Sequence, residues 1–385
     1  MTAVLSAFDF HPATRVVFGP GALERLGDLV REYGGARVLL VTDPGLKAVG
    51  HPLRARDILM RAGCEVYLYD AVEENPTTKH VGHCLEFARQ HVINFIVAVG
   101  GGSAMDCAKG VNFLLTNGGK MSDYKGFGLA KKPMLPSVGV PTSSGTGSEA
   151  QSYALIADEK THLKMACGDR KAAFVAAILD PELTVSLPPG VTAISGIDAI
   201  THAVESYVSL RRSLLSQALS REAWQLLAGS FERVLSTPSD VVARGQMQLG
   251  ANLAGMAIEN SMLGAAHATA NPLTAHYGIT HGVAVGIMIQ HVIRFNSVIV
   301  GSLYANLAQD VGLRLDPNGD PGETLALRIN TYLHAAGLPT RLRDCGVSSG
   351  IFEVLADEAC HQWTGKFNPR PVGEAEFISL YRSAY

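Results

Sequence analysis

The chain has 385 residues, of which 47% are hydrophobic and 17% charged, and its formal net charge is −3. This length exceeds one typical core and suggests two domains, while a charged share below the roughly 25% of an average globular protein fits large buried areas. Since no basic block is present, we expect neither nucleic acid nor an anionic membrane surface as a partner.

The first residues, MTAVLSAFDFHPATRVVFG, lack the basic and apolar regions of a secretory signal. The longest apolar runs fall short of the roughly 20 residues that a membrane helix needs. Six cysteines are scattered without a CxxC pair, a pattern typical of reduced thiols. We therefore expect a cytoplasmic protein.

The first half of the chain alternates short runs rich in β-branched residues with amphipathic stretches. Strands are predicted over residues 36–43, 65–70, 94–103 and 134–142, with helices between them over 52–63, 78–91 and 104–115. This alternation predicts βαβ units and a Rossmann-like parallel sheet. The segment 172–189 is expected to supply a last strand and a proline-marked junction, so residues 1–189 are assigned to an α/β domain.

From about Thr192 the strand pattern disappears. Apolar residues then recur at i, i+3, i+4 and i+7 over 213–235, 243–262, 323–337 and 351–363. This period predicts helices, so residues 190–385 are expected to form an all-helical domain.

Two glycine-rich loops follow apolar runs in the first half: VAVGGGSAMDCAK (97–109) and GVPTSSGTGSE (139–149). Glycine lets the backbone approach a bulky anion, and a following helix adds its positive N-terminal end. The alternative is a tight strand-to-helix turn for the first loop, which is not the GxGxxG fingerprint, and a flexible surface linker for the second. Two such loops at strand ends of one sheet nevertheless favour a dinucleotide.

Asp43, at the end of VLLVTD, stands where a carboxylate could accept hydrogen bonds from the adenosine ribose. The alternative is an ordinary turn aspartate before Pro44. If the first interpretation holds, its charge repels a 2′-phosphate and favours NAD over NADP.

The segment GIDAITHAVESY places Asp198 and His202 four residues apart, on one face of a helix. His267 and His281 lie beside small residues in otherwise hydrophobic segments. A single such histidine is usually structural, but a buried aspartate together with three imidazoles calls for a cation. One carboxylate and three nitrogens suit Fe(II), Zn(II) or another first-row divalent ion, and the absence of nearby cysteine favours a catalytic site.

These segments resemble the iron-containing (group III) alcohol dehydrogenase family along nearly the full chain. GGGSAMDCAK is similar to the family's GGGSxxDxxK loop, PTSSGTGSE to its PTTxGTGSE loop, and GIDAITHAVESY to its DAxxHxxE segment. ILDPELTVSLPP, FNPRPV (367–372) and LYRSAY match further family segments. The resemblance implies a nucleotide domain, a helical metal-binding and catalytic domain with a cleft between them, and homodimers or larger even assemblies.

The resemblance also implies the site residues. The metal, Fe(II) or alternatively Zn(II), is expected to be held by Asp198, His202, His267 and His281. NAD contacts are expected from Asp43, Asn75, Gly101, Gly102, Ser103, Thr142, Ser143, Lys164 and Leu183.

One position departs from the family pattern. Family members commonly carry a histidine four residues after the third metal ligand, near nicotinamide and substrate, but Asn271 stands there in this chain. Asparagine cannot act as a base, although it can orient a water or a hydroxyl. Proton exit would then use cofactor ribose and water or His276, or the substrate would differ.

The resemblance implies reversible oxidation of a small alcohol to an aldehyde or ketone, with a divalent metal polarising the substrate oxygen and hydride passing to NAD. A glycerol-dehydrogenase-type polyol oxidase shares this fold but uses fewer metal ligands. A dehydroquinate-synthase-like lyase needs cationic residues for an anionic substrate, and no lysine lies between Gly190 and His291. A NAD-binding sensor protein would have no reason to keep the complete ligand set.

Overall fold

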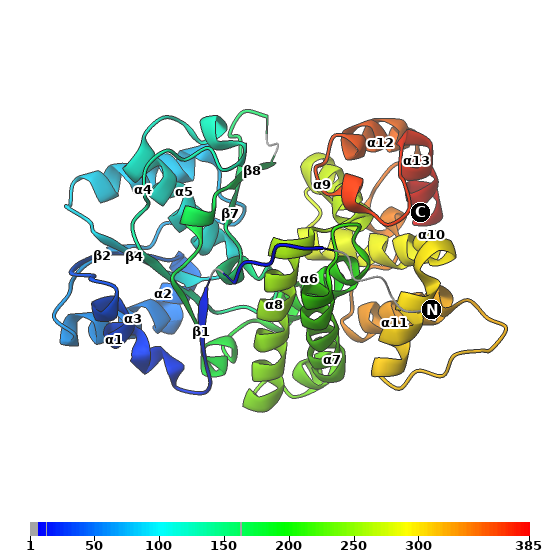
Figure 1. Ribbon diagram of the computed structural model, residues 1–385, viewed down its shortest axis with the longest axis horizontal. Helices are drawn as coiled ribbons and strands as arrows, with labels where there is room; N and C mark the ends of the chain where they lie inside the picture. The colour runs from blue at the N-terminus through cyan, green and yellow to red at the C-terminus, as the bar shows by residue number, and fades with distance from the viewer. Residues whose placement is uncertain (1–6, 13, 162–163) are drawn as a thin grey trace. The chain divides into compact units, whose positions relative to one another are not determined.

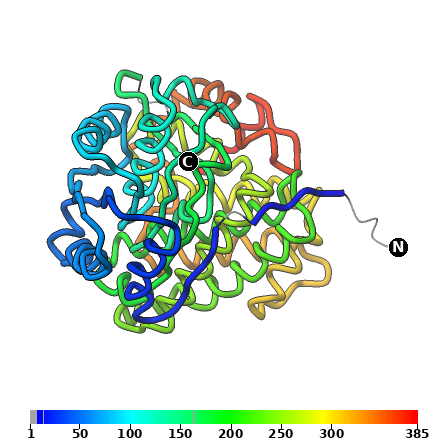
Figure 2. Tube along the Cα trace, turned by 60° about the vertical axis from the view of Figure 1, so that its left-hand side comes forward, coloured from blue at the N-terminus to red at the C-terminus, as the bar shows by residue number. Residues whose placement is uncertain are grey.

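The computed structural model describes residues 7–12, 14–161 and 164–385. It divides into two compact units, Pro12–Leu187 and Pro188–Tyr385, with residues 7–11 assigned to the second. In that second unit, residues 7–11 run without helix or strand, as the blue end of the trace in Figure 2 shows, and His11 N–H donates to Asn260 Oδ1 at 3.2 Å.

A six-stranded parallel sheet forms the middle of the first unit, in the order β1-β9-β6-β4-β2-β3. Its strands are β1 (Arg15–Phe18), β2 (Arg37–Val41), β3 (Glu65–Tyr69), β4 (Phe95–Gly100), β6 (Ser137–Pro141) and β9 (Ala176–Leu179). The central strands are rich in valine, isoleucine and leucine and are buried on both faces, as parallel strands covered by helices must be.

Helices cover both faces of this sheet (Figure 1). They are α1 (Leu26–Glu32), α2 (Pro44–Val49), α3 (His51–Arg61), α4 (Thr78–Arg89) and α5 (Gly102–Asn117). Because side chains alternate along a strand, Val38 and Leu40 of β2 join the core beneath α1 and α3, whereas Leu39 and Val41 join the core beneath α4 and α5.

A smaller three-stranded sheet has the order β5-β8-β7. It consists of β5 (Gly126–Phe127), β7 (Tyr153–Ala157) and β8 (Lys164–Gly168), and β7 and β8 pair antiparallel. The sequence patterns predict none of these strands. Strand β5 precedes the second glycine-rich loop, and β7 and β8 follow it.

In the second unit, the described residues form helices and no strand. They are α6 (Pro189–Val208), α7 (Leu214–Ser236), α8 (Val241–Ser261), α9 (Ala265–Tyr277), α10 (His281–Asp310), α11 (Pro321–Ala335), α12 (Phe352–Cys360) and α13 (Glu374–Ser383). The predicted fold class, a parallel-sheet domain followed by a helical one, is confirmed.

Two glycines let α10 approach α6 closely. A Cβ on Gly282 would lie 2.3 Å from Ile194 O, and one on Gly286 would lie 2.6 Å from Ile197 Cγ2. These distances are too short for any side chain, so only glycine permits the contact. The approach brings His281, the first residue of α10, towards α6.

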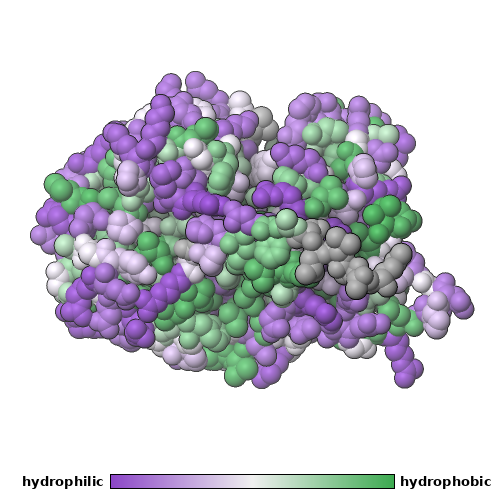
Figure 3. Space-filling view, viewed as in Figure 1, coloured by the Kyte–Doolittle hydropathy of each residue, from purple (hydrophilic) through white to green (hydrophobic). Residues whose placement is uncertain are grey.

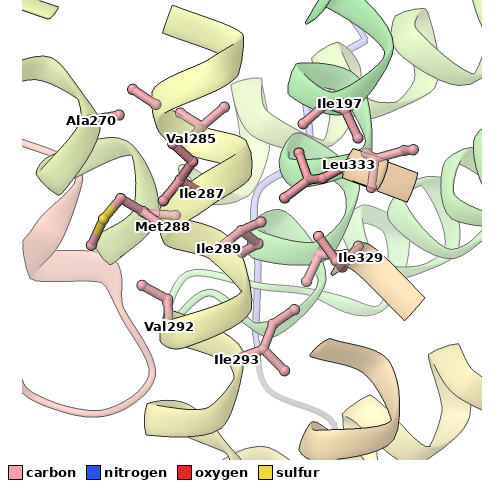
Figure 4. Close-up of a cluster of buried hydrophobic side chains, with 14 of the residues drawn as sticks. Ile197, Ala270, Val285, Ile287, Met288, Ile289, Val292, Ile293, Ile329 and Leu333 are labelled. Carbon is pink, nitrogen blue, oxygen red and sulfur yellow. The ribbon is translucent and has the colours of Figure 1, made fainter. Parts of the chain in front are cut away.

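The middle of α10 is apolar on all sides. Figure 4 shows Val285, Met288, Ile289 and Ile293 leaving this helix in different directions, a distribution typical of a buried helix. By length and composition α10 could also cross a membrane, but 72% of its most apolar stretch is buried inside the fold. That burial accounts for its apolar character.

Candidate metal centre and nucleotide loops

One face of α6 carries three buried side chains with ligand chemistry. Asp198, His202 and Glu205 stand at positions i, i+4 and i+7, which a helix places on the same side. Each is at most 5% exposed. The carboxylate and imidazole predicted to lie together from their spacing are therefore adjacent and inside the fold.

Three imidazoles surround one oxygen of Asp198. Its Oδ1 lies 3.5 Å from His202 Nε2, 3.6 Å from His267 Nε2 and 3.9 Å from His281 Nε2. His267 is in the first turn of α9, and His281 opens α10. Four donors held tetrahedrally about 2.1 Å from one ion would lie roughly 3.4 Å apart, so these distances suit a shared ion.

The donor atoms of Asp198, His267 and His281 all lie within 4.8 Å of one another. His202 is outside that group of three, but its Nε2 is the imidazole nitrogen closest to Asp198 Oδ1. Its ring also stacks on that of His267, with centroids 4.8 Å apart. All four predicted ligands are therefore brought together.

Two buried atoms of this cluster lack a hydrogen-bond partner within the part of the chain that the structure describes: Asp198 Oδ1 and His267 Nε2. An unsatisfied buried polar atom costs stability, so a missing ligand is the simplest reason for both. Burial raises the pKa of the Asp198 carboxyl, but the imidazoles of His202, His267 and His281 outweigh it and hold that pKa far below its usual range.

The donor set fits iron. Three imidazole nitrogens and one carboxylate oxygen suit a first-row divalent ion, whereas calcium and magnesium prefer oxygen ligands throughout. The side chain of His281 is 25% exposed while those of the other three ligands are at most 7% exposed. A substrate would therefore have access from the side of His281.

Glu205 is a residue of this site whose role the sequence analysis misses. Its Oε2 lies 2.6 Å from His267 Nδ1. Burial lowers the pKa of the His267 imidazole, but the adjacent carboxylates of Asp198 and Glu205 outweigh it and raise that pKa to about 9. The signal was present in the sequence, because Glu205 lies on the same helical face as the two ligands.

The two candidates for proton transfer lie on different sides of α9. Asn271 follows His267 by one helical turn, and its Nδ2 donates to Gln362 Oε1 at 2.9 Å. His276 follows His267 by nine residues, half a turn out of phase, and its Nε2 lies 2.8 Å from Glu358 Oε1. The structure thus places Asn271, and not His276, on the side of the metal ligands.

In the first unit, the GGGS loop joins β4 directly to α5. The strand ends at Gly100 and the helix begins at Gly102, so the observed strand is shorter than the predicted one, residues 94–103. Gly101 is the N-cap and supplies no side chain, which leaves the first N–H groups of α5 available for an anion. Asn75, with a left-handed φ of 52°, donates its N–H to Ser103 Oγ at 3.3 Å.

The second glycine-rich loop packs against the first. Thr142 N–H donates to Gly100 O at 3.0 Å. A Cβ on Gly101 would lie 3.3 Å from Ser143 Oγ, and one on Gly102 would lie 2.7 Å from Thr146 Cγ2. Because β6 and β4 are neighbours, the sheet itself brings the two loops together.

Asp43 lies at the end of β2, the next strand along the same edge. Its Oδ1 accepts from Leu46 N–H at 2.9 Å and so caps α2. A Cβ on Gly100 would lie 3.5 Å from its Oδ2. Asp43 is therefore both a helix cap and a neighbour of the GGGS loop.

Lys164 and Leu183 are placed differently from the other predicted NAD contacts. Lys164 is the first residue of β8. Burial raises the pKa of Asp106 in α5, and the charge of Lys164 opposes that rise, so Lys164 lies near the helix that follows the GGGS loop. Leu183 is 1% exposed and packs in the core beneath α1 and α3. Its side chain is part of that core rather than of the loop surface.

A buried lysine, also missed from sequence, holds the two loops in place. Lys109 of α5 is 2% exposed, and its Nζ donates to Ser148 O at 2.6 Å and to Tyr153 O at 2.9 Å. Ser148 Oγ in turn donates to Asp106 Oδ1 at 2.7 Å. The aspartate and lysine of GGGSxxDxxK therefore tie α5 to the loop after β6.

Comparison with known proteins gives consistent matches along the chain. Residues 13–181 match the family model described as iron-containing alcohol dehydrogenase, and residues 192–385 match the C-terminal model of the same family. Alcohol dehydrogenase 4 of Schizosaccharomyces pombe is 36% identical, over 96% of this chain and 87% of that protein.

Two further proteins show the same likeness. The 1,3-propanediol dehydrogenase of Citrobacter freundii is 34% identical, over 98% of this chain and 99% of its own length. The crystal structure of a 1,3-propanediol oxidoreductase superposes with a TM-score of 0.95 at 33% identity, covering 99% of this chain and 100% of that one.

Proposed function

We propose that this chain, which belongs to the iron-containing alcohol dehydrogenase family, holds its metal through Asp198, His202, His267 and His281. The chain is an NAD-linked, metal-dependent alcohol dehydrogenase, and iron is the metal of its family. The observation that carries the ligand assignment is the single oxygen, Asp198 Oδ1, within 3.9 Å of three imidazole Nε2 atoms.

The chemistry divides between the ion and the chain. When bound, the ion supplies Lewis acidity that polarises the substrate oxygen. The buried side chains of Asp198, His202 and His267 would keep water from their side of the ion, and the more exposed His281 would leave a side open to substrate. NAD, when bound, would supply the hydride acceptor for the alcohol and, in the reverse direction, the hydride donor for the aldehyde or ketone.

We propose that NAD is bound by the loops at the ends of β2, β4 and β6. The contacting residues would be Asp43, Asn75, Gly101, Gly102, Ser103, Thr142 and Ser143, together with Lys164 of β8 and backbone groups of Leu183, whose side chain is in the core. Support comes from the open N-terminus of α5, a place suited to the pyrophosphate. The carboxylate of Asp43 would select NAD against NADP by repelling a 2′-phosphate.

Asn271 is our candidate for the polar group beside the reacting atoms. Its Nδ2 donates one hydrogen to Gln362, which leaves Oδ1 as an acceptor and the second N–H as a donor for a substrate or water hydroxyl. His276 stays the weaker candidate, because its Nε2 is engaged by Glu358. Asn271 would orient a hydroxyl or a water, because an asparagine amide cannot act as a base.

Small alcohols, including those with a second hydroxyl, are the proposed substrates. The support is the likeness to two proteins named for 1,3-propanediol. We would measure NADH formation at 340 nm with metal-stripped protein reloaded with Fe(II) or Zn(II) under anaerobic conditions. Activity restored only with metal, and higher on 1,3-propanediol than on 1-propanol, would support the proposal. Equal activity on both would remove the role of the second hydroxyl.

We also propose a homodimer or a larger even assembly. Helix α8 carries half-buried or exposed apolar residues at helical spacing, Val242, Leu249, Leu253 and Met256, and Figure 3 shows apolar side chains gathered over this helix. A second copy would cover this stripe. Sedimentation should give an even multiple of 40.8 kDa, and Leu253→Asp should shift it towards one copy. A parent chain that sediments as one copy contradicts this.

A cytoplasmic location is proposed from the cysteines. All six are free thiols, and four of them are buried. Reduced thiols are typical of the cytoplasm. Fractionation of the source cells, with the chain detected by antibody, tests this location, and recovery in an exported fraction would contradict it.

A further inference from the structure

The side of His267 that faces away from Asp198 is lined by a buried carboxylate. Glu205 is 3% exposed, its Oε2 lies 2.6 Å from His267 Nδ1, and its Oε1 accepts from Ala266 N–H at 2.7 Å. A buried carboxylate is costly unless its oxygens are hydrogen-bonded, and both oxygens of Glu205 are. The Glu205 side chain of α6 thus contacts both the proposed metal ligand His267 and the backbone of α9, the helix that carries it.

The start of α9 is held by a second side chain. Ala265 N–H donates to Asn368 Oδ1 at 3.3 Å, so Asn368 and Glu205 together take two of the first N–H groups of the helix. Gly264, the N-cap, makes room for them, because a Cβ there would lie 3.0 Å from Asn368 Oδ1 and 3.0 Å from Glu205 Oε1.

Asn368 is itself fixed by reciprocal hydrogen bonds. Its Nδ2 donates to Asn296 Oδ1 at 2.7 Å and to Arg370 O at 2.7 Å, while Asn296 Nδ2 donates back to Asn368 Oδ1 at 3.0 Å. Asn368 and Arg370 belong to the C-terminal segment FNPRPV (367–372), and Asn296 belongs to α10. The segment is thereby tied to both helices that supply a metal ligand after α6.

We propose that Glu205 and Asn368 are positioning residues that set the metal affinity of this chain by fixing His267. This rests on the proposed ligand set. His267 Nδ1–H donates to the Glu205 carboxylate, which leaves the lone pair of His267 Nε2 for the metal. Asn368 acts one step further out, by holding the first turn of α9 from which His267 projects.

Charge balance supports the same role for Glu205. The carboxylates of Asp198 and Glu205 carry two negative charges in a buried place, and one divalent ion with neutral imidazoles balances them. Glu205 therefore strengthens the attraction for a divalent ion without occupying one of its coordination positions. The coordination positions that a substrate oxygen would use therefore stay open.

The test is metal affinity of the full chain, read with Co(II) as a spectroscopic probe. Metal-stripped protein is titrated with Co(II), the visible absorption band is recorded, and affinity is measured by competition with a chelator. Glu205→Gln should weaken Co(II) binding by roughly 10- to 100-fold and alter the band, because its amide cannot satisfy both Ala266 N–H and His267 Nδ1–H. Asn368→Ala should weaken binding less, by about threefold to tenfold.

Three comparisons make the result decisive. Glu222→Gln removes an exposed carboxylate of α7 and should leave Co(II) affinity unchanged. Glu205→Asp keeps the charge and should recover part of the lost affinity, and it replaces Glu205→Gln as the deciding variant if the latter does not fold. NAD affinity should stay constant in all of them.

A folded Glu205→Gln that binds Co(II) within twofold of the parent, with an unchanged band, would overturn the proposal. Failure of the ligand set is recognised separately through Asp198→Ala. If Asp198→Ala still binds Co(II) at parental affinity, the proposed ligands are wrong. If Asp198→Ala loses the metal and Glu205→Gln does not, only the positioning role is wrong.

Discussion

The metal centre and the nucleotide loops use different parts of the chain. The candidate metal centre consists of buried side chains from α6, α9 and α10, each at a defined position on its helix. The nucleotide loops consist mainly of backbone groups at the ends of parallel strands, with glycine providing the space. The first site should therefore fail when a functional group is removed, and the second when an atom is added.

Removal of Asp198 should have the largest effect. Asp198→Ala deletes the one oxygen shared by three imidazoles, so we expect metal retention to be lost and kcat/KM to fall on the order of a thousandfold. Metal content after gel filtration and NADH formation at 340 nm measure this. NAD affinity should stay nearly intact, and an equal loss of NAD binding would contradict the separation of the two sites.

Addition of a methyl group at Gly102 should damage the other site. The new Cβ would lie 2.7 Å from Thr146 Cγ2, so Gly102→Ala must push the two loops apart. We expect NAD to bind about tenfold more weakly, or ~1.4 kcal/mol, with metal content unchanged. Gly82→Ala in α4, where nothing lies within 4 Å, is the matched control. Equal NAD affinities in the two variants would refute the expectation.

Replacement of Asp43 should change cofactor choice rather than overall activity. Asp43→Gly removes the carboxylate, and we expect the ratio of NADP to NAD efficiency to rise about tenfold. The variant also loses the cap of α2, but glycine costs only a few tenths of a kcal/mol at that position. Asp240→Gly, which removes the cap of α8 and the ion pair with Arg233 but lies outside the nucleotide loops, controls for this. If the ratio of NADP to NAD efficiency stays unchanged, Asp43 does not select between the two cofactors.

How much the sequence predicts differs between the two sites for a physical reason. Asp198 and His202 are four residues apart on one helix, so spacing alone predicts their proximity. His267 and His281 come from other helices, and the resemblance to a family identified them. Glu205 could be placed on the right face, but its partner Ala266 N–H belongs to α9 and no local pattern points to it.

In the first unit, local sequence predicts the two glycine-rich loops but not the long-range hydrogen bonds that hold them together. The glycines were recognised, whereas the role of Lys109 depends on Ser148 and Tyr153, far along the chain. Strands β7 and β8 have five residues each, as β2 has, but they form an antiparallel pair outside the strand–helix alternation on which the strand prediction rests. Helix α10 is not predicted because a helix buried on all sides shows no apolar period. The fold class and the activity were nevertheless predicted correctly.

The smallest predicted effect distinguishes a bystander histidine from the proposed ligands. Burial and, to a smaller extent, the charge of Arg294 lower the pKa of His291 from an ordinary value of 6.5 to about 4, against the opposing effect of Glu323. Between those values the unfolded chain binds a proton that the folded chain does not, so this histidine contributes stability above pH 6.5 that is lost as pH falls towards 4.

His291→Gln should therefore make the protein less sensitive to acid. In metal-stripped protein, the fall in Tm between pH 7 and pH 4.5 should shrink by about 2–4 °C relative to the parent. His334→Gln, at an exposed position of α11, should leave that fall unchanged. Metal content at pH 7 should stay at the parental level in both variants, because neither side chain belongs to the proposed ligand set. Loss of metal in His291→Gln would mean that the metal centre extends further along α10 than His281.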